Sequence, residues 1–292
     1  ESQARQHLST GPAELSVDFH LQTVADPTGE VQTYRRLCML KKQTSELSAA
    51  DLRQLSSARK VATQVAVNAA HVVCCTCSTA GDPLLAGFSF PYVLIDEAGQ
   101  ATEVDTLGCI VLGARQLVLV GDDKQLGPTI TSKAADAAGL GIPLFARMRH
   151  CGHTPIMLDE QYRMHPTIAE YPSLAFYDGA LRNGVTAADR AMPAAVPSPW
   201  QETPRFFLCS YGSEGDSGGR SKYNHSEAEA ALGLVEGLLT AGIRQAQIAV
   251  LTPYAAQRAR LRSGVVQLVS RLLGLSEEQV ELEVNSIDAF QC

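Results

Sequence analysis

The segment Tyr-Val-Leu-Ile-Asp-Glu-Ala-Gly-Gln-Ala, residues 92–101, decides the fold of this chain. Its short apolar run ends abruptly in carboxylates, and a similar pattern returns in Leu-Val-Leu-Val-Gly-Asp-Asp-Lys-Gln-Leu, residues 117–126. Such runs are buried strands in parallel α/β sheets, and ligands bind at the carboxyl ends of those strands. Two acidic strand ends side by side predict a site for a metal-bound phosphate. We therefore expect an α/β protein driven by a nucleotide, with strands at 93–95 and 116–120.

Length and composition describe an ordinary globular protein. The chain has 292 residues, which suggests about two domains, and 45% of them are hydrophobic. No apolar run approaches the ~18 residues that a membrane span needs. The first residues lack the apolar stretch of a secretory signal and the chain does not begin with Met, so we expect an internal start. The net charge of -7 argues against a surface coated in positive charge but leaves a local basic groove possible.

Strand and helix patterns alternate along the rest of the chain, which predicts parallel sheets. Ser48 followed by Asp51 resembles a helix cap, and apolar residues then recur at helical spacing up to Ala69. A second capping pattern at Ser226 predicts a helix to about Thr240. Residues 212–219 have no Gly-Lys-Ser/Thr step and are predicted to be a mobile loop. Further strands are expected at 71–77, 205–209, 248–251 and 284–287.

Three cysteines crowd the predicted strand at 71–77, namely Cys74, Cys75 and Cys77. They have two interpretations. A zinc site would need a partner such as the Cys151-Gly152-His153 segment, whereas the alternative is a set of buried structural thiols. The eight cysteines of the chain suggest a reducing compartment and not a disulfide framework.

The two acidic strand ends carry the residues that phosphoryl transfer to water requires. Asp96 ends its strand where it could hold the water shell of a magnesium ion, and Glu97 could polarise the attacking water. An acidic pair also caps helices, so the alternative for these two residues alone is structural. Gly121 permits a tight turn after the second strand, and Gln125 could reach the γ-phosphate or the water. Two such ends in one α/β unit favour the functional interpretation.

A third polar segment, Gln-Tyr-Arg-Met-His-Pro at residues 161–166, adds a cation and an aromatic ring. The guanidinium of Arg163 fits phosphate oxygens, and the ring of Tyr162 offers a face for adenine. The alternative for Arg163 is a surface ion pair with Asp159 or Glu160. Two later strand ends, at 251–254 and 284–291, place small polar groups where they could hold a nucleic-acid backbone without reading bases.

The order of these segments resembles a superfamily 1 RNA helicase of the regulator-of-nonsense-transcripts family, which acts in nonsense-mediated mRNA decay. The blocks that carry the resemblance are 74–77, 80–83, 111–114, 161–166, 183–190 and 288–291. The family implies two RecA-like lobes with ATP between them, here residues 1–155 and 156–292, both incomplete. It also implies a small helical insertion near residues 15–70 that overhangs the RNA. Single-stranded RNA and mRNA-decay factors are the implied partners of a cytoplasmic monomer.

The resemblance assigns roles to particular residues of this chain. Asp96 would hold Mg²⁺ through water, Glu97 would activate the attacking water, and Gln125 and Arg163 would contact the γ-phosphate. Tyr162 would stack on adenine, with Gly121 and Asp122 beside the nucleotide. Residues near the nucleic acid would be Ser78, Thr79, Pro253, Tyr254 and Ser286.

Four departures from the family pattern shape the prediction. Ala98-Gly99 stands where Ser or Ala and Thr are usual, and Ala255-Ala256 replaces a Glu-Gly pair. The chain has no Gly-Lys dipeptide, so it lacks a Walker A loop, and Cys292 follows Gln291 where the family continues with glycine and arginine. We therefore expect the parent protein to be an ATP-dependent RNA helicase, and the segment alone to be inactive and weakly folded.

Two alternatives remain open at this stage. One is a related superfamily 1 helicase acting on DNA or RNA–DNA hybrids. The other is a non-catalytic nucleic-acid-binding or protein-binding remnant without Walker A.

Overall fold

The computed structural model describes residues 29–44, 47–196, 203–219 and 221–291. The chain divides into two compact units, Glu1–His153 and Thr154–Cys292. The pairing of short parallel strands with intervening helices confirms the predicted α/β organisation. That each unit is a RecA-like lobe, with the division at residues 155 and 156, stays a prediction.

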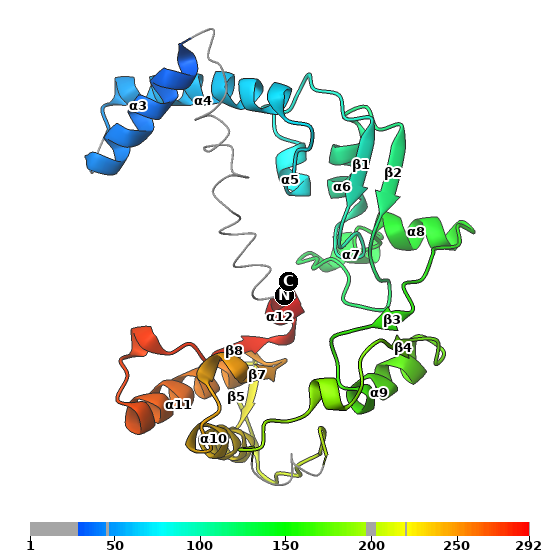
Figure 1. Cartoon of the computed structure of the whole chain (residues 1–292), viewed down its shortest axis with the longest axis vertical. Coiled ribbons are helices and arrows are strands. Elements are labelled where there is room, and N and C mark those ends of the chain that lie inside the picture. Colours follow the sequence, from blue (N-terminus) through cyan, green and yellow to red (C-terminus); the bar gives the residue numbers. More distant parts are fainter. Residues whose placement is uncertain (1–28, 45–46, 197–202, 220, 292) are drawn as a thin grey trace. The chain divides into compact units, whose positions relative to one another are not determined.

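The first described elements are a pair of helices, α3 (Glu30–Gln43) and α4 (Ala49–Ala69), which pack against each other (Figure 1). As predicted, the Ser48 hydroxyl accepts a hydrogen bond from the backbone N–H of Asp51, which satisfies one of the free donors at the helix start. Small residues on α4 let the two helices approach closely. Their shared core consists of Val31, Ala62 and Ala66, with Tyr34 and Val65 beside it. The part of the predicted insertion before residue 29 lies outside the described residues.

The strand predicted at 71–77 is wrong. Residues 72–76 pair with no strand among the described residues, and the short helix α5 (Cys77–Ala80) begins inside the predicted range. Cys74 and Cys75 are exposed and Cys77 is half-buried, which corrects the interpretation of these thiols as buried.

The sheet of the first unit is the parallel pair β1 (Tyr92–Ile95) and β2 (Gln116–Leu119), connected through α6 (Glu103–Ile110). Figure 1 shows the two strands side by side, with α6 beside β1. The predicted positions of both strands are confirmed, but their predicted burial is not. Only Ile95 is buried, whereas Tyr92 is 74% exposed, because no further described strand or helix covers that side chain. Two short helices complete the unit, α7 (Lys133–Ala137) and α8 (Leu144–His150).

The second unit opens with two short parallel strands, β3 (Glu160–Gln161) and β4 (Arg182–Asn183), joined through α9 (Pro166–Phe176). A 3₁₀ turn, η2 (Ala188–Arg190), follows β4. The strand predicted at 205–209 is wrong, since these residues have no ladder partner among the described segments.

The predicted loop at 212–219 is instead the first half of an antiparallel hairpin, β5 (Glu214–Asp216) with β6 (Lys222–Asn224). Cross-strand contacts explain why this glycine-rich segment is ordered. Lys222 pairs with Glu214 at 2.6 Å, and the Tyr223 ring covers Gly215 so closely that a Cβ there would lie 2.3 Å from the ring. Arg260, on helix α11 (Ala255–Leu273), places its guanidinium 4.6 Å from the centroid of the Tyr223 ring, which is within reach of a cation–π interaction.

The core of the second unit lies between two helices and the parallel pair β7 (Ala249–Thr252) and β8 (Glu283–Ser286). The helices are α10 (His225–Thr240) and α11 (Ala255–Leu273). Both the predicted helix to Thr240 and the two strands are confirmed. The cap of α10 is Asn224 and not Ser226, because the Asn224 side chain accepts the N–H groups of Ser226 and Glu227. The remaining elements are η3 (Gln245–Gln247), η4 (Glu277–Gln279) and α12 (Ile287–Gln291).

Candidate nucleotide site

The turn after β1 presents two exposed carboxylates. The N–H of Glu97 donates to Oδ1 of Asp96 at 3.0 Å, and the Gln100 side-chain amide donates to Oε2 of Glu97 at 2.9 Å. Glu97 has a φ of 52°, in the left-handed region that non-glycine residues rarely adopt. This conformation turns the chain sharply at the strand end and leaves both carboxylates on the surface.

The turn after β2 is organised by Asp122. Its Oδ1 accepts the N–H of Lys124 at 2.9 Å, and its Oδ2 accepts the side-chain amide of Gln125 at 2.9 Å. The predicted γ-phosphate contact Gln125 is therefore held beside the predicted nucleotide contact Asp122 in this structure.

The two turns touch through their backbones. Ala98 N–H donates to the Val120 carbonyl at 2.8 Å, which extends the strand pairing into the turns. A Cβ at Gly99 would lie 2.7 Å from the carbonyl oxygen of Asp122, and a Cβ at Gly121 would lie 2.8 Å from the nitrogen of Gly99. Such distances are too short for any side chain, so only glycine at both positions allows this approach. The structure thus brings the Asp96–Glu97 turn next to the Asp122–Gln125 turn, as the parallel pairing predicts.

Two arginines of α8, which the sequence analysis missed, form ion pairs with the turn after β2 and with the start of α6. Arg149 forms an ion pair with Asp123, next to Asp122, and Arg147 holds Glu103 at the start of α6 with two bonds of 2.6 and 2.7 Å. The hydrogen bonds from Arg147 lower the pKa of Glu103 below its ordinary value, against a smaller opposing effect of desolvation. These partners are 26 and 44 residues apart in the chain, so no local pattern could have indicated them.

In the second unit, the loop after β3 is built around the side chain of Gln161, which is 9% exposed. Its Oε1 accepts the N–H groups of Arg163 and Met164 at 2.9 and 2.7 Å. Its Nε2 donates to the Met164 carbonyl at 2.9 Å and to Oδ1 of Asn183 at 2.7 Å. All of the bonding capacity of this amide is used to close the loop, a role that the sequence analysis did not foresee.

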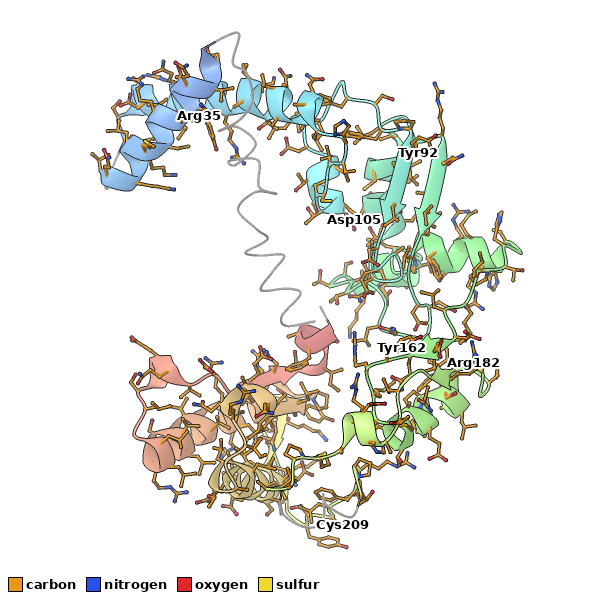
Figure 2. The ribbon with its side chains drawn as sticks, viewed as in Figure 1. Arg35, Tyr92, Asp105, Tyr162, Arg182 and Cys209 are labelled. Carbon is orange, nitrogen blue, oxygen red and sulfur yellow. The ribbon has the colours of Figure 1, made fainter. Side chains whose placement is uncertain are left out.

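Tyr162 and Arg163 follow Gln161 directly, at the carboxyl end of β3. Tyr162 is 59% exposed, and its ring lies over Gly184, where a Cβ would be 2.3 Å away. A hydrogen bond to Glu160 raises the pKa of the Tyr162 hydroxyl, and the negative charge of that carboxylate adds to the effect. Figure 2 shows Tyr162 and Arg182 on adjoining parts of this unit. Arg182 pairs with Asp159 at 3.0 Å, so one of the two carboxylates considered for Arg163 already has another cation.

The residues predicted near nucleic acid fall into two places, one in each unit. Ser78 and Thr79 are exposed on α5, whose first turn is capped by a bond from the Thr79 N–H to the Thr76 hydroxyl at 3.2 Å. Pro253, Tyr254 and Ser286 lie at the carboxyl ends of β7 and β8, where Thr252 and Ser286 are in register. The Tyr254 N–H donates to the buried Thr252 hydroxyl at 3.3 Å, which fixes the turn that carries Tyr254.

Within the described part of the chain, no group of three or more His, Cys, Asp or Glu side chains is arranged to hold a metal ion directly. The considered zinc pairing of the 74–77 cysteines with Cys151 and His153 is therefore not formed there. Among the same residues, no helix has both the length and the apolar character needed to cross a membrane.

Polar turns packed at the carboxyl ends of parallel strands are typical of α/β nucleotide-binding proteins. Sequence comparison agrees with this class. One AAA-domain family model matches residues 140–292, and a second matches residues 3–133. The chain belongs to this family of AAA-domain proteins.

The chain is also similar to part of several curated helicases and regulators of nonsense transcripts. The chain is 43% identical over 259 residues to the regulator of nonsense transcripts 1 homolog of Drosophila melanogaster, covering 88% of this chain and 22% of the relative. It is 40% identical over 277 residues to the Arabidopsis thaliana homolog, covering 94% and 22%. It is 42% identical over 261 residues to the ATP-dependent helicase NAM7 of Saccharomyces cerevisiae, covering 88% and 26%. The predicted resemblance to this helicase family is confirmed, and the chain spans about a quarter or less of these relatives.

Proposed function

We propose that the protein containing this chain is an ATP-dependent RNA helicase that acts in nonsense-mediated mRNA decay. It couples ATP hydrolysis to movement on single-stranded RNA, as a monomer in the cytoplasm that works with mRNA-decay factors. Each of the two units is a RecA-like lobe in this proposal. The names of the relatives, one an ATP-dependent helicase and others regulators of nonsense transcripts, support this proposal.

The observation that carries the proposal is the backbone contact between the turns after β1 and β2. It brings the two turns that carry Asp96, Glu97 and Asp122 together at one edge of a parallel sheet. Oxygen donors of this kind suit Mg²⁺, which keeps several of its waters and is bound by one or two carboxylates together with substrate phosphates. The donor set therefore fits a magnesium–ATP complex. When bound, Mg²⁺ would neutralise charge that develops on the phosphates.

Each site residue has a distinct task in this proposal. Asp96 would hold Mg²⁺ through water, and Glu97 would polarise the attacking water as its general base. Gln125, kept in place by Asp122, contacts the γ-phosphate. Arg163 supplies positive charge to the same phosphate, and Tyr162 stacks on adenine.

In this proposal, the chain contributes the residues that would contact Mg²⁺ and the attacking water during ATP hydrolysis. It has no Gly-Lys dipeptide, so the lysine and backbone amides that cradle phosphates in a P-loop are not among its residues. The nucleic acid would lie against Ser78 and Thr79 of one unit and against Pro253, Tyr254 and Ser286 of the other. These residues offer hydroxyls and one aromatic ring, which suits binding without a sequence preference.

The test is ATP hydrolysis by the full-length protein, measured with poly(U) and with poly(dT). Glu97→Gln should lower the RNA-stimulated kcat by about 100-fold or more, because it removes a general base. The exposed Glu281, mutated to Gln, serves as the matched control and should leave the rate unchanged. Equal stimulation by poly(dT) would contradict the RNA preference, and full activity of the Glu97→Gln variant would contradict the catalytic assignment.

A further inference from the structure

The loop that carries Tyr162 and Arg163 is held from two sides. On the inner side, the Gln161 amide binds the N–H groups of Arg163 and Met164. On the outer side, the guanidinium of Arg190 binds carbonyl groups of the same loop. Its Nε donates to the Arg163 carbonyl at 2.9 Å, and its Nη2 donates to the Tyr162 carbonyl.

The position of Arg190 is fixed by its own turn. The Asp189 carboxylate accepts the N–H and the hydroxyl of Thr186 at 2.8 and 2.7 Å, and the Asp189 N–H donates back to the Thr186 hydroxyl at 3.3 Å. These bonds close the turn into η2, at whose end Arg190 stands. A third guanidinium nitrogen, Nη1, donates to the Asp189 carbonyl at 3.0 Å. All three guanidinium nitrogens therefore donate to backbone carbonyls.

We propose that Arg190 is a positioning residue that fixes the two peptide groups carrying Tyr162 and Arg163 and so aims both side chains. Holding two successive carbonyls restrains the backbone dihedrals between them, and these dihedrals set the direction of each side chain. Bonds from a charged donor are stronger than those between neutral groups. Through two of these bonds Arg190 holds the loop itself, so we place it in a positioning role. This inference rests on the proposed nucleotide role of the loop.

The experiment is a double-mutant cycle of Arg190→Gln and Arg163→Gln in the full-length protein, with kcat and KM for ATP measured in the presence of RNA. Arg190→Gln should lower kcat/KM by about tenfold, the effect of losing one or two charge-assisted hydrogen bonds. The double variant should lose clearly less than the product of the two single effects, since residues that act through one another are not additive. Arg190→Lys, which can reach one carbonyl, should recover part of the loss.

The matched control is Arg205→Gln. Arg205 also lies on the surface of the second unit, but its guanidinium pairs with the Glu170 carboxylate of α9 at 2.7 Å. This variant should keep the parent kcat and KM. The melting temperature of each variant distinguishes a loss of folding from a loss of side-chain orientation in the loop. If Arg190→Gln has a lower melting temperature than the parent protein, Arg190→Lys replaces it in the cycle.

The outcomes separate the two proposals. A neutral Arg163→Gln variant would overturn the nucleotide role of the loop. A damaging Arg163→Gln combined with a neutral replacement of Arg190, or with effects that multiply fully in the double variant, would overturn the positioning role alone.

Discussion

The turns after β1 and β2 and the loop after β3 both present charged side chains at the carboxyl ends of parallel strands, but they are built in different ways. The first two turns are held together backbone to backbone, through Gly99 and Gly121. The third is held by side chains, with Gln161 inside it and Arg190 outside. The contact between the two glycine turns is disrupted by adding a Cβ atom, whereas the loop after β3 is disrupted by removing the side chains that hydrogen-bond to it. The predictions below use this difference.

Gly121→Ala is expected to have the largest effect. Its Cβ would lie 2.8 Å from the Gly99 nitrogen and 3.1 Å from that of Ala98, so the two turns must separate. ATP hydrolysis by the full-length protein should fall by about 100-fold, the effect of misplacing catalytic groups by about 1 Å.

The control for this prediction lies in the same loop. A Cβ at Gly127 meets nothing within 4 Å, so Gly127→Ala should leave the rate unchanged. Equal rates for the two alanine variants would show that the backbone contact does not position the catalytic carboxylates.

Gln161→Ala tests the loop that is held by side chains. It removes four hydrogen bonds and leaves the N–H groups of Arg163 and Met164 without their acceptor. The free energy of unfolding of the second unit should fall by about 1–3 kcal/mol, the usual cost of leaving partly buried donors unsatisfied. Urea denaturation measures this change. Gln267→Ala, at an exposed position of α11, is the control and should change it by less than about 0.5 kcal/mol. A Gln161 variant as stable as this control would mean that the loop does not depend on the amide.

The smallest effect is expected at the ion pair of Arg147 with Glu103, which joins α8 to the start of α6. The pKa of Glu103 is lowered in the folded state, so its contribution to stability is present above the unfolded pKa and is lost as pH falls through the folded pKa. Arg147→Gln should return the Glu103 pKa toward its ordinary value, as followed by NMR titration, and should flatten the acid limb of the stability curve. An unchanged titration of Glu103 in this variant would rule out Arg147 as the cause.

Much of the site could be predicted from sequence, because its residues directly follow short apolar runs. Parallel strands bring their carboxyl ends to one edge, so the neighbourhood of Asp96 and Gln125 follows from the pattern once β1 and β2 pair. The errors have a common physical origin. The runs at 71–77 and 205–209 have the composition of strands, but a strand exists only with a ladder partner, and among the described residues neither has one. The hairpin at 214–224 was missed for the opposite reason, since its order comes from Tyr223, Lys222 and Arg260 and not from its glycine-rich composition.

The amino-acid sequence by itself determined the class of fold, the order of the polar strand ends and the residue types that nucleotide chemistry requires. These properties depend on local periodicity and on neighbours in the chain, which a sequence displays directly. Only the tertiary structure decided that Gly99 and Gly121 bring two turns into contact, that Gln161 bonds to Asn183, and that Arg190 reaches the carbonyls of Tyr162 and Arg163. Those contacts join residues 22–28 positions apart, and the geometry that aligns them is set by the pairing of strands and not by any local pattern.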